Sequence, residues 1–234
     1  MTMIRTTPIA IALVVLASLA GCGEAEDDVK TDPGPHCSGV PSELTVPFGQ
    51  VGRGGSAVTL HWMLDTGCVP VTYDPRLESR AEDIRAAVAA WKDGVSCNRL
   101  CLANPSASPA RPAPRGEQRI HFSLASSGDP RLDGEPFFTS QSALMESGRL
   151  LVAEVFIAES AVATISRQHL MRSVGYTLGL THVPDSREVK ALMSRKTAAE
   201  LEGPTEADRA SICRLYGERP YCEGGGGEQP VGSP

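Results

Sequence analysis

The most informative stretch of this sequence reads Arg172-Ser173-Val174-Gly175-Tyr176-Thr177-Leu178-Gly179-Leu180-Thr181-His182. Apolar residues in and before it recur at helical spacing, which predicts a helix over residues 161–178. One face of this helix is apolar and consists of Leu170, Met171, Val174 and Leu178. The other face carries His169, Arg172, Ser173 and Tyr176. Gly179 is expected to end the helix, because glycine is favoured directly after a helix C-terminus.

This spacing resembles the elongated zinc motif HExxHxxGxxH of the metzincin proteases. In that family two histidines one helical turn apart bind zinc, and the glutamate between them activates the bound water. The glycine then bends the chain toward a third histidine. Gly179 and His182 match the glycine and the third histidine. Arg172 stands at the first ligand position, Ser173 at the glutamate position and Tyr176 at the second ligand position.

Two further segments extend the resemblance. Leu192-Met193-Ser194 looks like the methionine turn beneath the zinc of metzincins, and residues 205–217 are similar to the closing helix of matrixins. The order of helix 79–93, strand 119–124, strand 150–157, site helix, methionine turn and closing helix follows the same family. The resemblance covers residues 58–218. It implies an α+β, zincin-like domain with a twisted mixed sheet, a long first helix, a site helix and a closing helix.

The substitutions within the motif predict that the zinc site is lost. A catalytic zinc needs three protein ligands and an open position. His182 is one such ligand, but Tyr176 is a poor neutral donor and Arg172 carries a permanent positive charge. His169 lies about 4.5 Å along the helix axis before the first ligand position, so it cannot simply substitute. Ser173 has no basic group to activate water. We therefore expect no catalytic residue and no cofactor.

Other interpretations of these residues have less support. Ser173 and His182 could act as nucleophile and base, but no third residue that would orient the base is evident. Gly128-Asp129 and Asp133-Gly134 faintly resemble the loop where matrixins hold structural zinc and calcium. The histidine of that loop is Ser127 here, and ordinary Asp-Gly turns explain the pattern. In place of the metal, the Arg172 guanidinium is expected to pair with a carboxylate or a carbonyl group.

The resemblance implies a catalytically inactive pseudoprotease that binds a protein or peptide in the former substrate cleft. An edge strand of the sheet would pair there with an extended chain. Two alternatives stay open. One is a zinc-dependent metalloendopeptidase with non-standard ligands, which would recruit zinc through His182, His169 and an unidentified ligand. The other is a structural envelope lipoprotein whose cleft is filled by its own side chains.

Residues 1–21 are typical of a signal peptide, because Arg5 precedes an apolar run over residues 9–20. This run is too short to span a bilayer, which needs about 18 apolar residues. It ends in Leu19-Ala20-Gly21-Cys22, which matches the bacterial lipobox. Cys22 is therefore expected to be lipidated and to anchor the exported chain to a membrane. Gly23 rather than aspartate follows, which favours the outer membrane; an ordinary signal peptide with a chance cysteine is the alternative.

Composition predicts one domain with flexible ends. Loss of residues 1–21 leaves 213 of the 234 residues, enough for a single well-cored domain. Residues 22–57 are acidic and rich in Pro and Gly, as a tether is, and residues 219–234 form a Gly-rich tail. The net charge of −6 and an aromatic content of 5% argue against a nucleic-acid partner.

Six cysteines remain beside Cys22, namely Cys37, Cys68, Cys97, Cys101, Cys213 and Cys222. An even number in an exported chain is typical of disulfides. Six cysteines allow fifteen pairings, so the sequence alone does not select one. Proximity along the chain favours Cys97 with Cys101 and Cys213 with Cys222, which leaves Cys37 with Cys68. A zinc cluster is disfavoured because no CxxC pair occurs.

Local patterns predict several elements before the site helix. Ser79-Arg80-Ala81-Glu82 is a potential capping box at the start of the first helix. Residues 60–63 and 69–73 have the β-branched and aromatic content of strands. Strand 119–124 alternates in polarity, so that His121 is expected to point outward. Strand 150–157 is a nearly continuous apolar run, as in a buried strand.

Overall fold

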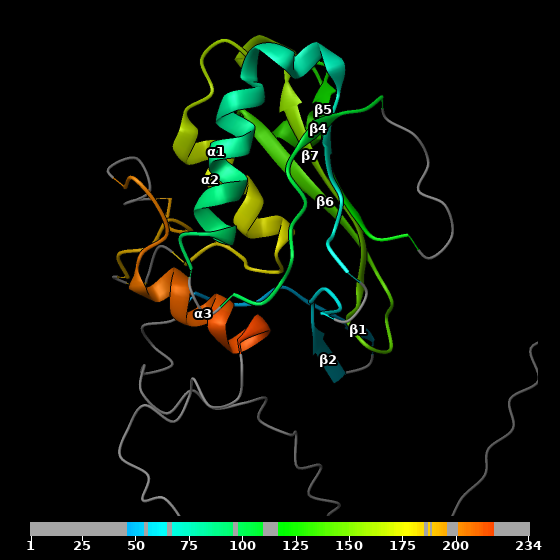
Figure 1. Cartoon of the computed structure of the whole chain (residues 1–234), viewed down its shortest axis with the longest axis vertical. Coiled ribbons are helices and arrows are strands. Elements are labelled where there is room, and N and C mark those ends of the chain that lie inside the picture. The colour runs from blue at the N-terminus through cyan, green and yellow to red at the C-terminus, as the bar shows by residue number, and fades with distance from the viewer. Residues whose placement is uncertain are drawn as a thin grey trace, which may run out of the picture. The chain divides into compact units, whose positions relative to one another are not determined.

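The computed structural model describes residues 46–53, 56–64, 67–95, 98–109, 117–184, 187, 189–195 and 201–217. These residues form an α+β domain with a five-stranded mixed sheet, three α-helices and a separate two-stranded hairpin (Figure 1). The expected α+β class is thus confirmed. The expected signal peptide at residues 1–21, Cys22 and the expected tail at residues 219–234 lie outside the described residues. Within the described residues, no helix is long and apolar enough to cross a membrane.

The sheet has the strand order β4-β3-β5-β7-β6. Its strands are β3 (Val71–Tyr73), β4 (Ser106–Ala107), β5 (Arg119–Ala125), β6 (Phe137–Ala143) and β7 (Leu150–Ala158). Neighbouring strands from β4 to β7 are parallel, whereas β6 pairs antiparallel with β7. Strand β6 therefore forms one edge of this sheet. The order of elements along the chain follows the expected one.

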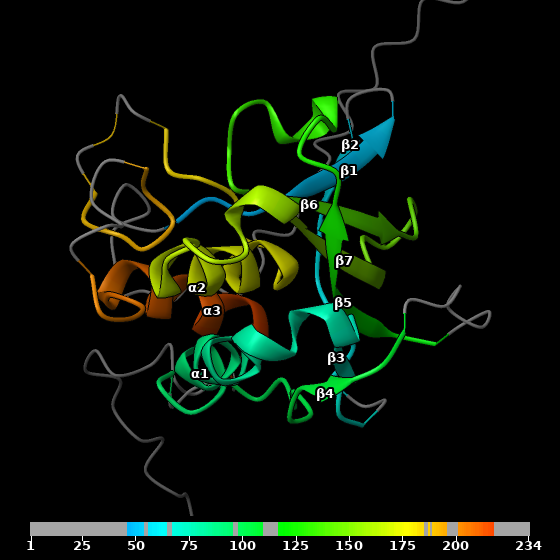
Figure 2. The same cartoon turned by 90° about the horizontal axis from the view of Figure 1, so that it is seen from above.

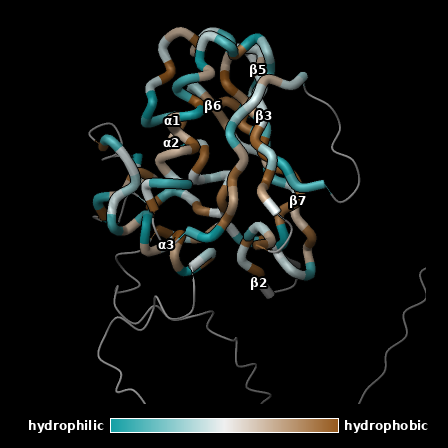
Figure 3. Tube along the Cα trace, viewed as in Figure 1, coloured by the Kyte–Doolittle hydropathy of each residue, from teal (hydrophilic) through white to brown (hydrophobic). Residues whose placement is uncertain are grey.

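Helices α1 (Ala81–Lys92) and α2 (Arg167–Thr177) lie on the same side of the sheet (Figure 2). The predicted apolar face of α1 is buried and consists of Ile84, Ala87, Val88 and Trp91. Hydrophobic residues concentrate where these helices meet the strands (Figure 3). The Trp91 indole N–H donates to the Met171 carbonyl at 2.7 Å, so a polar contact also joins the two helices.

The start of α1 differs from the prediction, because no capping box forms at residues 79–82. The chain enters α1 through a 3₁₀ helix, η2 (Pro75–Arg80), which is capped by the Asp74 carboxylate. The Ala81 N–H already donates to the Glu78 carbonyl within this turn. Backbone donors at the junction are therefore satisfied without a side-chain cap, and Arg80 stands at the N-cap of α1.

Two strand predictions also need correction. His121 is 1% exposed rather than turned to solvent, because it lies between its register partners Thr72 and Glu154, and its Nδ1 lies 2.7 Å from the Thr72 hydroxyl. Residues 60–63 form one isolated bridge, from His61 to Arg149, instead of a strand. Trp62 turns into the core there, and its indole donates to the Thr177 carbonyl at 2.8 Å.

The folded part begins earlier than the boundary expected at residue 58. Val46 is fully buried, and its N–H donates to the Ser211 hydroxyl at 2.8 Å. The hairpin of β1 (Gln50–Arg53) and β2 (Ser56–Thr59) follows directly. Residues 46–53 and 56–57 thus belong to the folded domain. The Gly content of this stretch is typical of a linker, so the sequence alone did not indicate that it is folded. The contacts that order it come from distant segments such as Ser211.

The favoured disulfide pairing is wrong for two cysteines. Cys68 is bonded to Cys101, 33 residues away in the chain. The parallel bridge beside them explains the pairing, since the Val69 N–H donates to the Cys101 carbonyl at 2.8 Å. Cys213 is also disulfide-bonded. The other candidates, Cys37, Cys97 and Cys222, lie outside the described residues.

Candidate functional site

Helix α2 carries the predicted site residues. It begins after Ser166, whose hydroxyl accepts a hydrogen bond from the His169 N–H at 3.3 Å. Its apolar face is fully buried and consists of Leu170, Met171, Val174 and Leu178. Gly179 follows the helix with a φ of +91°, where a Cβ would collide with the Leu60 carbonyl oxygen. Glycine is required at this turn, which redirects the chain toward His182.

A pocket of about 590 Å³ lies beside α2. Arg172 and Tyr176 line it from the helix, and His182 lines it from the segment after the turn. Strand β6 contributes the lining residues Phe137, Phe138, Thr139 and Gln141. The structure therefore brings Arg172, Tyr176 and His182, the three residues that the motif spacing singled out, to one cavity beside an edge strand of the sheet.

Arg172 is the most buried cation of this pocket, with 6% of its surface exposed. Its Nη2 lies 3.8 Å from the Glu135 carboxylate, and the Arg195 Nη1 lies 3.9 Å from the other oxygen of the same carboxylate. The Arg172 guanidinium carbon also lies 5.6 Å from the centre of the Phe137 ring. Its Nε is buried and has no hydrogen-bond partner in the described part of the chain. The expected pairing of Arg172 with a carboxylate is present.

Tyr176 is half-buried, and its ring centre lies 6.2 Å from that of Phe137. Burial raises the pKa of Tyr176, and the positive charges of Arg172 and Arg195 oppose this only in part. The phenol is therefore neutral near pH 7. Gln141 reaches from β6 to donate a hydrogen bond to the Tyr176 carbonyl, which ties the edge strand to the helix.

His169 and Ser173 do not take part in the pocket wall. His169 Nδ1 lies 2.9 Å from the Ser166 hydroxyl, and burial, together with Arg172, lowers the pKa of His169. Ser173 is fully buried, and its hydroxyl donates to the Leu170 carbonyl at 2.7 Å. His182, by contrast, is exposed. Because the Ser173 hydroxyl is buried and hydrogen-bonded to the helix backbone, it is not available as a nucleophile beside His182.

Met193 is fully buried against α2. Its N–H and the Leu192 N–H both donate to the Asp208 carboxylate, at 3.3 and 2.7 Å. Asp208 belongs to α3 (Glu206–Tyr216) and also caps that helix, because it accepts hydrogen bonds from the Thr205 N–H and hydroxyl. One buried carboxylate thus holds the methionine segment and the start of α3 together beneath the site helix.

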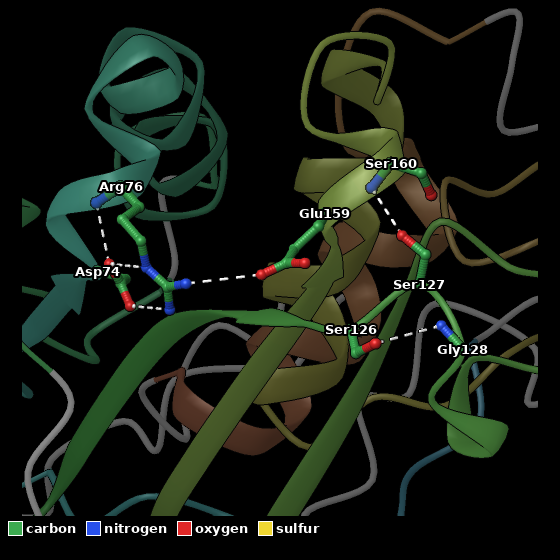
Figure 4. A network of polar contacts seen from close by, with 7 residues as sticks. All are labelled: Asp74, Arg76, Ser126, Ser127, Gly128, Glu159 and Ser160. Carbon is green, nitrogen blue, oxygen red and sulfur yellow. Dashed lines mark hydrogen bonds and ion pairs between the residues drawn. The ribbon is translucent and has the colours of Figure 1, made fainter.

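Hydrogen bonds of Ser126 and Ser127 hold the start of the loop between β5 and β6 (Figure 4). The Ser127 hydroxyl accepts a hydrogen bond from the Ser160 N–H at 3.0 Å. Nearby, Arg76 bridges Asp74 at 2.9 Å and Glu159 at 3.5 Å. Ser127 thus joins this loop to the segment after β7.

The described residues do not fit a zinc site. No group of three or more His, Cys, Asp or Glu side chains within the described ranges is placed to hold a metal ion. A guanidinium group and a neutral phenol accompany His182 in the pocket, and neither is a good zinc ligand at neutral pH. We therefore derive no metal-dependent step at this site.

Sequence reasoning pointed to Arg172, Tyr176 and His182 but missed Glu135 and Arg195. Glu135 lies far from the motif in the chain, in the loop before β6, and no local pattern marks it. Arg195 directly follows Leu192-Met193-Ser194, so its place beside the methionine segment was the signal that could have found it. No protein-family model matches this chain, and no curated protein matches it. The function is therefore inferred from the geometry of the pocket and from the resemblance of its motif.

Proposed function

We propose that this chain is a metzincin-like pseudoprotease that binds an extended peptide in its former substrate cleft. The observation that carries the proposal is the convergence of Arg172, Tyr176 and His182 on one pocket beside the edge strand β6. This is the placement that the motif spacing implies for three metal ligands. The order of strands and helices and the buried Met193 beside α2 support the same interpretation.

The chemistry of the site favours binding over catalysis. Arg172 keeps its positive charge at any physiological pH, which disfavours a cation at the same place. The Ser173 hydroxyl is held by the Leu170 carbonyl and has no basic group to activate a water molecule. The position of the motif glutamate therefore supplies no general base for peptide hydrolysis.

Strand β6 offers backbone groups for a docked peptide. The Ala158 N–H donates to the Pro136 carbonyl at 3.0 Å, which makes these two residues a hydrogen-bonded pair of the β6–β7 ladder. Because such pairs alternate in an antiparallel ladder, the N–H and C=O groups of Phe137, Thr139 and Gln141 point away from β7. These same residues line the pocket. An extended peptide is expected to add there as a further strand.

A proline substitution on β6 tests this proposal. Thr139→Pro removes an outward N–H, which an edge strand tolerates because β7 does not use it. We expect Thr139→Pro to weaken binding of soluble ten-residue peptides by at least about tenfold, measured by calorimetry on peptides selected from a random library. Thr139→Val is the matched control, since it keeps the N–H and removes only the hydroxyl. Equal affinities for the two variants, or no peptide binding by the wild type, would contradict the proposal.

Metal analysis separates this proposal from the zinc-peptidase alternative. We expect the purified chain to contain far less than one zinc per molecule and to cleave no protein substrate. Stoichiometric zinc that a chelator removes together with peptidase activity would favour a metalloendopeptidase with non-standard ligands. The third candidate, a structural lipoprotein, requires a cleft filled by its own side chains, and the open pocket of about 590 Å³ disfavours it.

We further propose that the domain is exported and anchored to the outer membrane through a lipid on Cys22. The support for this is the lipobox sequence at residues 19–22. Replacement Cys22→Ala is expected to move the protein from the membrane fraction to the soluble fraction and to abolish palmitate labelling. Unchanged fractionation and labelling would show that Cys22 is not the anchor.

A further inference from the structure

The cationic groups of the pocket are incompletely paired. Arg172 and Arg195 share the single carboxylate of Glu135, so this group of three side chains carries a net positive charge. The two separations, 3.8 and 3.9 Å, exceed hydrogen-bonding distance. Arg172 is 6% exposed, and its buried Nε has no hydrogen-bond partner among the described residues. A buried guanidinium without hydrogen bonds is costly and favours an incoming acceptor.

Arg131, the third arginine that lines this pocket, is paired differently from Arg172 and Arg195. The guanidinium of Arg131 donates two hydrogen bonds to the Asp129 carboxylate, at 3.0 and 2.7 Å. It also lies over the rings of Phe138 and Phe156, at 4.5 and 5.2 Å from their centres. Arg131 therefore has a carboxylate partner of its own within the protein. Among the three arginines that line the pocket, Arg172 is the one whose buried Nε lacks a hydrogen-bond partner in the described part of the chain.

We propose that Arg172, assisted by Arg195, binds a carboxylate group of the peptide that docks on β6. This inference rests on the proposed peptide-binding function and names the group that the pocket selects. The carboxylate belongs either to the C-terminus of the peptide or to an Asp or Glu side chain, since both present the same two oxygens. Glu135 supports this choice, because its own carboxylate already lies against both arginines.

The expected contacts are strong ones. A guanidinium fork matches the two oxygens of a carboxylate, and such charge-assisted hydrogen bonds are about twice as strong as neutral ones. The phenol of Tyr176 lines the same pocket and can donate a further hydrogen bond. Glu135 competes with the ligand for the two arginines, so its negative charge weakens binding. Removal of that charge is expected to strengthen it.

Four peptide pools distinguish the two sources of the carboxylate. Random ten-residue peptides are made with or without Asp and Glu, and each set is made with a free or an amidated C-terminus. Binding to the full chain in detergent is measured by fluorescence anisotropy. We expect the pools that contain the recognised carboxylate to bind at least about tenfold more tightly than the pool that lacks both. The pool that gains affinity identifies a side-chain or a terminal carboxylate.

Variants then assign the effect to the pocket. Arg172→Lys keeps the charge but loses the fork, and we expect it to remove most of the preference for carboxylates. Arg76→Lys is the matched control, because Arg76 also bridges two carboxylates but lies outside the pocket (Figure 4). Glu135→Gln is expected to increase the affinity for carboxylate peptides several-fold. A misfolded variant would not produce such a gain.

The outcomes separate this inference from the proposed function. If neutral and acidic pools bind equally, and Arg172→Lys changes neither, the carboxylate inference is overturned. Peptide binding that Thr139→Pro still abolishes would then leave the proposed function standing. If no pool binds to the wild-type chain, both fail together. A weaker affinity of Glu135→Gln for acidic peptides would also overturn the inference, because it would make Glu135 part of the recognition rather than a competitor.

Discussion

The Met193 side chain packs directly against the helical residue Gly175. A methyl group at Gly175 would come within 2.5 Å of the Met193 sulfur and 2.8 Å of the Trp91 ring. No real Cβ atom accommodates contacts this short without movement of its neighbours. The site helix, the methionine segment and the first helix therefore meet at a position where only glycine fits.

Gly175→Ala is expected to destabilise the domain despite the better helix propensity of alanine. Propensity favours alanine by about 1 kcal/mol, whereas overpacking a buried contact costs about 1–3 kcal/mol. The Trp91 ring is rigid and fully buried, so the cost should exceed the gain. Urea unfolding followed by circular dichroism measures the difference. The penalty should shrink in a Met193→Ala background, and additive effects of the two substitutions would contradict the contact.

Asp208→Asn is expected to lower the free energy of unfolding by about 3 kcal/mol. The carboxylate of Asp208 accepts four hydrogen bonds, which come from Leu192, Met193 and Thr205. An amide nitrogen in its place cannot accept them and would face other donors. The exposed neighbour Glu206 provides the matched control, since Glu206→Gln should change stability by less than about 0.5 kcal/mol. Similar losses for the two variants would refute the anchoring role of Asp208.

Two histidines should create zinc affinity in this pocket. In the double variant Arg172→His/Tyr176→His, imidazoles replace the two pocket residues that lie one helical turn apart on α2. With His182 they provide the three ligands that a zinc ion needs. We expect one zinc per molecule in elemental analysis and in competition with a chromogenic chelator. Peptidase activity is not expected, because Ser173 cannot replace the glutamate.

The role of His182 is checked in the same background. Adding His182→Ala should weaken zinc affinity by orders of magnitude, and Arg172→His/Tyr176→Phe, which has one imidazole fewer, should behave similarly. A folded double variant that binds no zinc would show that these positions do not correspond to metzincin ligands. Zinc binding that is independent of His182 would likewise show that His182 does not correspond to the third metzincin ligand.

Removal of the Cys68–Cys101 disulfide should destabilise the domain by about 3–4 kcal/mol. The bond closes a loop over a sequence separation of 33 residues, and the entropy lost by the unfolded chain rises slowly with loop length. The comparison is between the wild type and Cys68→Ala/Cys101→Ala in urea. Peptide mapping of a non-reduced digest provides the direct test of pairing. A peptide that links Cys101 to Cys97 would contradict the structure.

Stability is expected to fall as the pH drops below about 6.5, in part through His121. Burial, and secondarily the charge of Arg119, lowers the pKa of His121 in the folded state. Below the unfolded-state pKa the unfolded chain therefore binds a proton that the folded chain does not, so the free energy of unfolding decreases. His121→Gln should flatten this decrease between pH 7.5 and 5.5. An unchanged slope in urea unfolding would contradict the prediction.

His169 is expected to contribute in the same direction, because burial and then the charge of Arg172 lower its pKa in the folded state. His169→Gln should therefore remove a further part of the decrease in the free energy of unfolding between pH 7.5 and 5.5. The two histidines differ in the arginine that lowers their pKa, which is Arg172 for His169 and Arg119 for His121. Arg172→Gln should reduce the share of the slope that depends on His169 and leave the share of His121 unchanged.

The local features of this domain could be read from the residues themselves. The apolar faces of α1 and α2, the glycine turn at Gly179 and the positions of β3, β5 and β7 along the chain all depend on neighbours a few positions apart. The periodicity of side chains along a helix or a strand expresses such short-range relations directly. The motif spacing likewise sufficed to select Arg172, Tyr176 and His182, because one helical turn and one tight turn connect them.

The remaining features depended on segments that meet only in the folded chain. Glu135 pairs with Arg172 across the pocket, Cys68 with Cys101 across a parallel bridge, and Val46 with Ser211 across 165 residues. His121 is buried because side chains of the two neighbouring strands, Thr72 and Glu154, lie beside it. Strand register and loop closure determine these contacts, and neither is encoded in the periodicity of a single segment. The residue types of the site therefore follow from the sequence. The charge pairing within the site, the disulfide of the domain and the boundary of the domain follow from how the segments pack together.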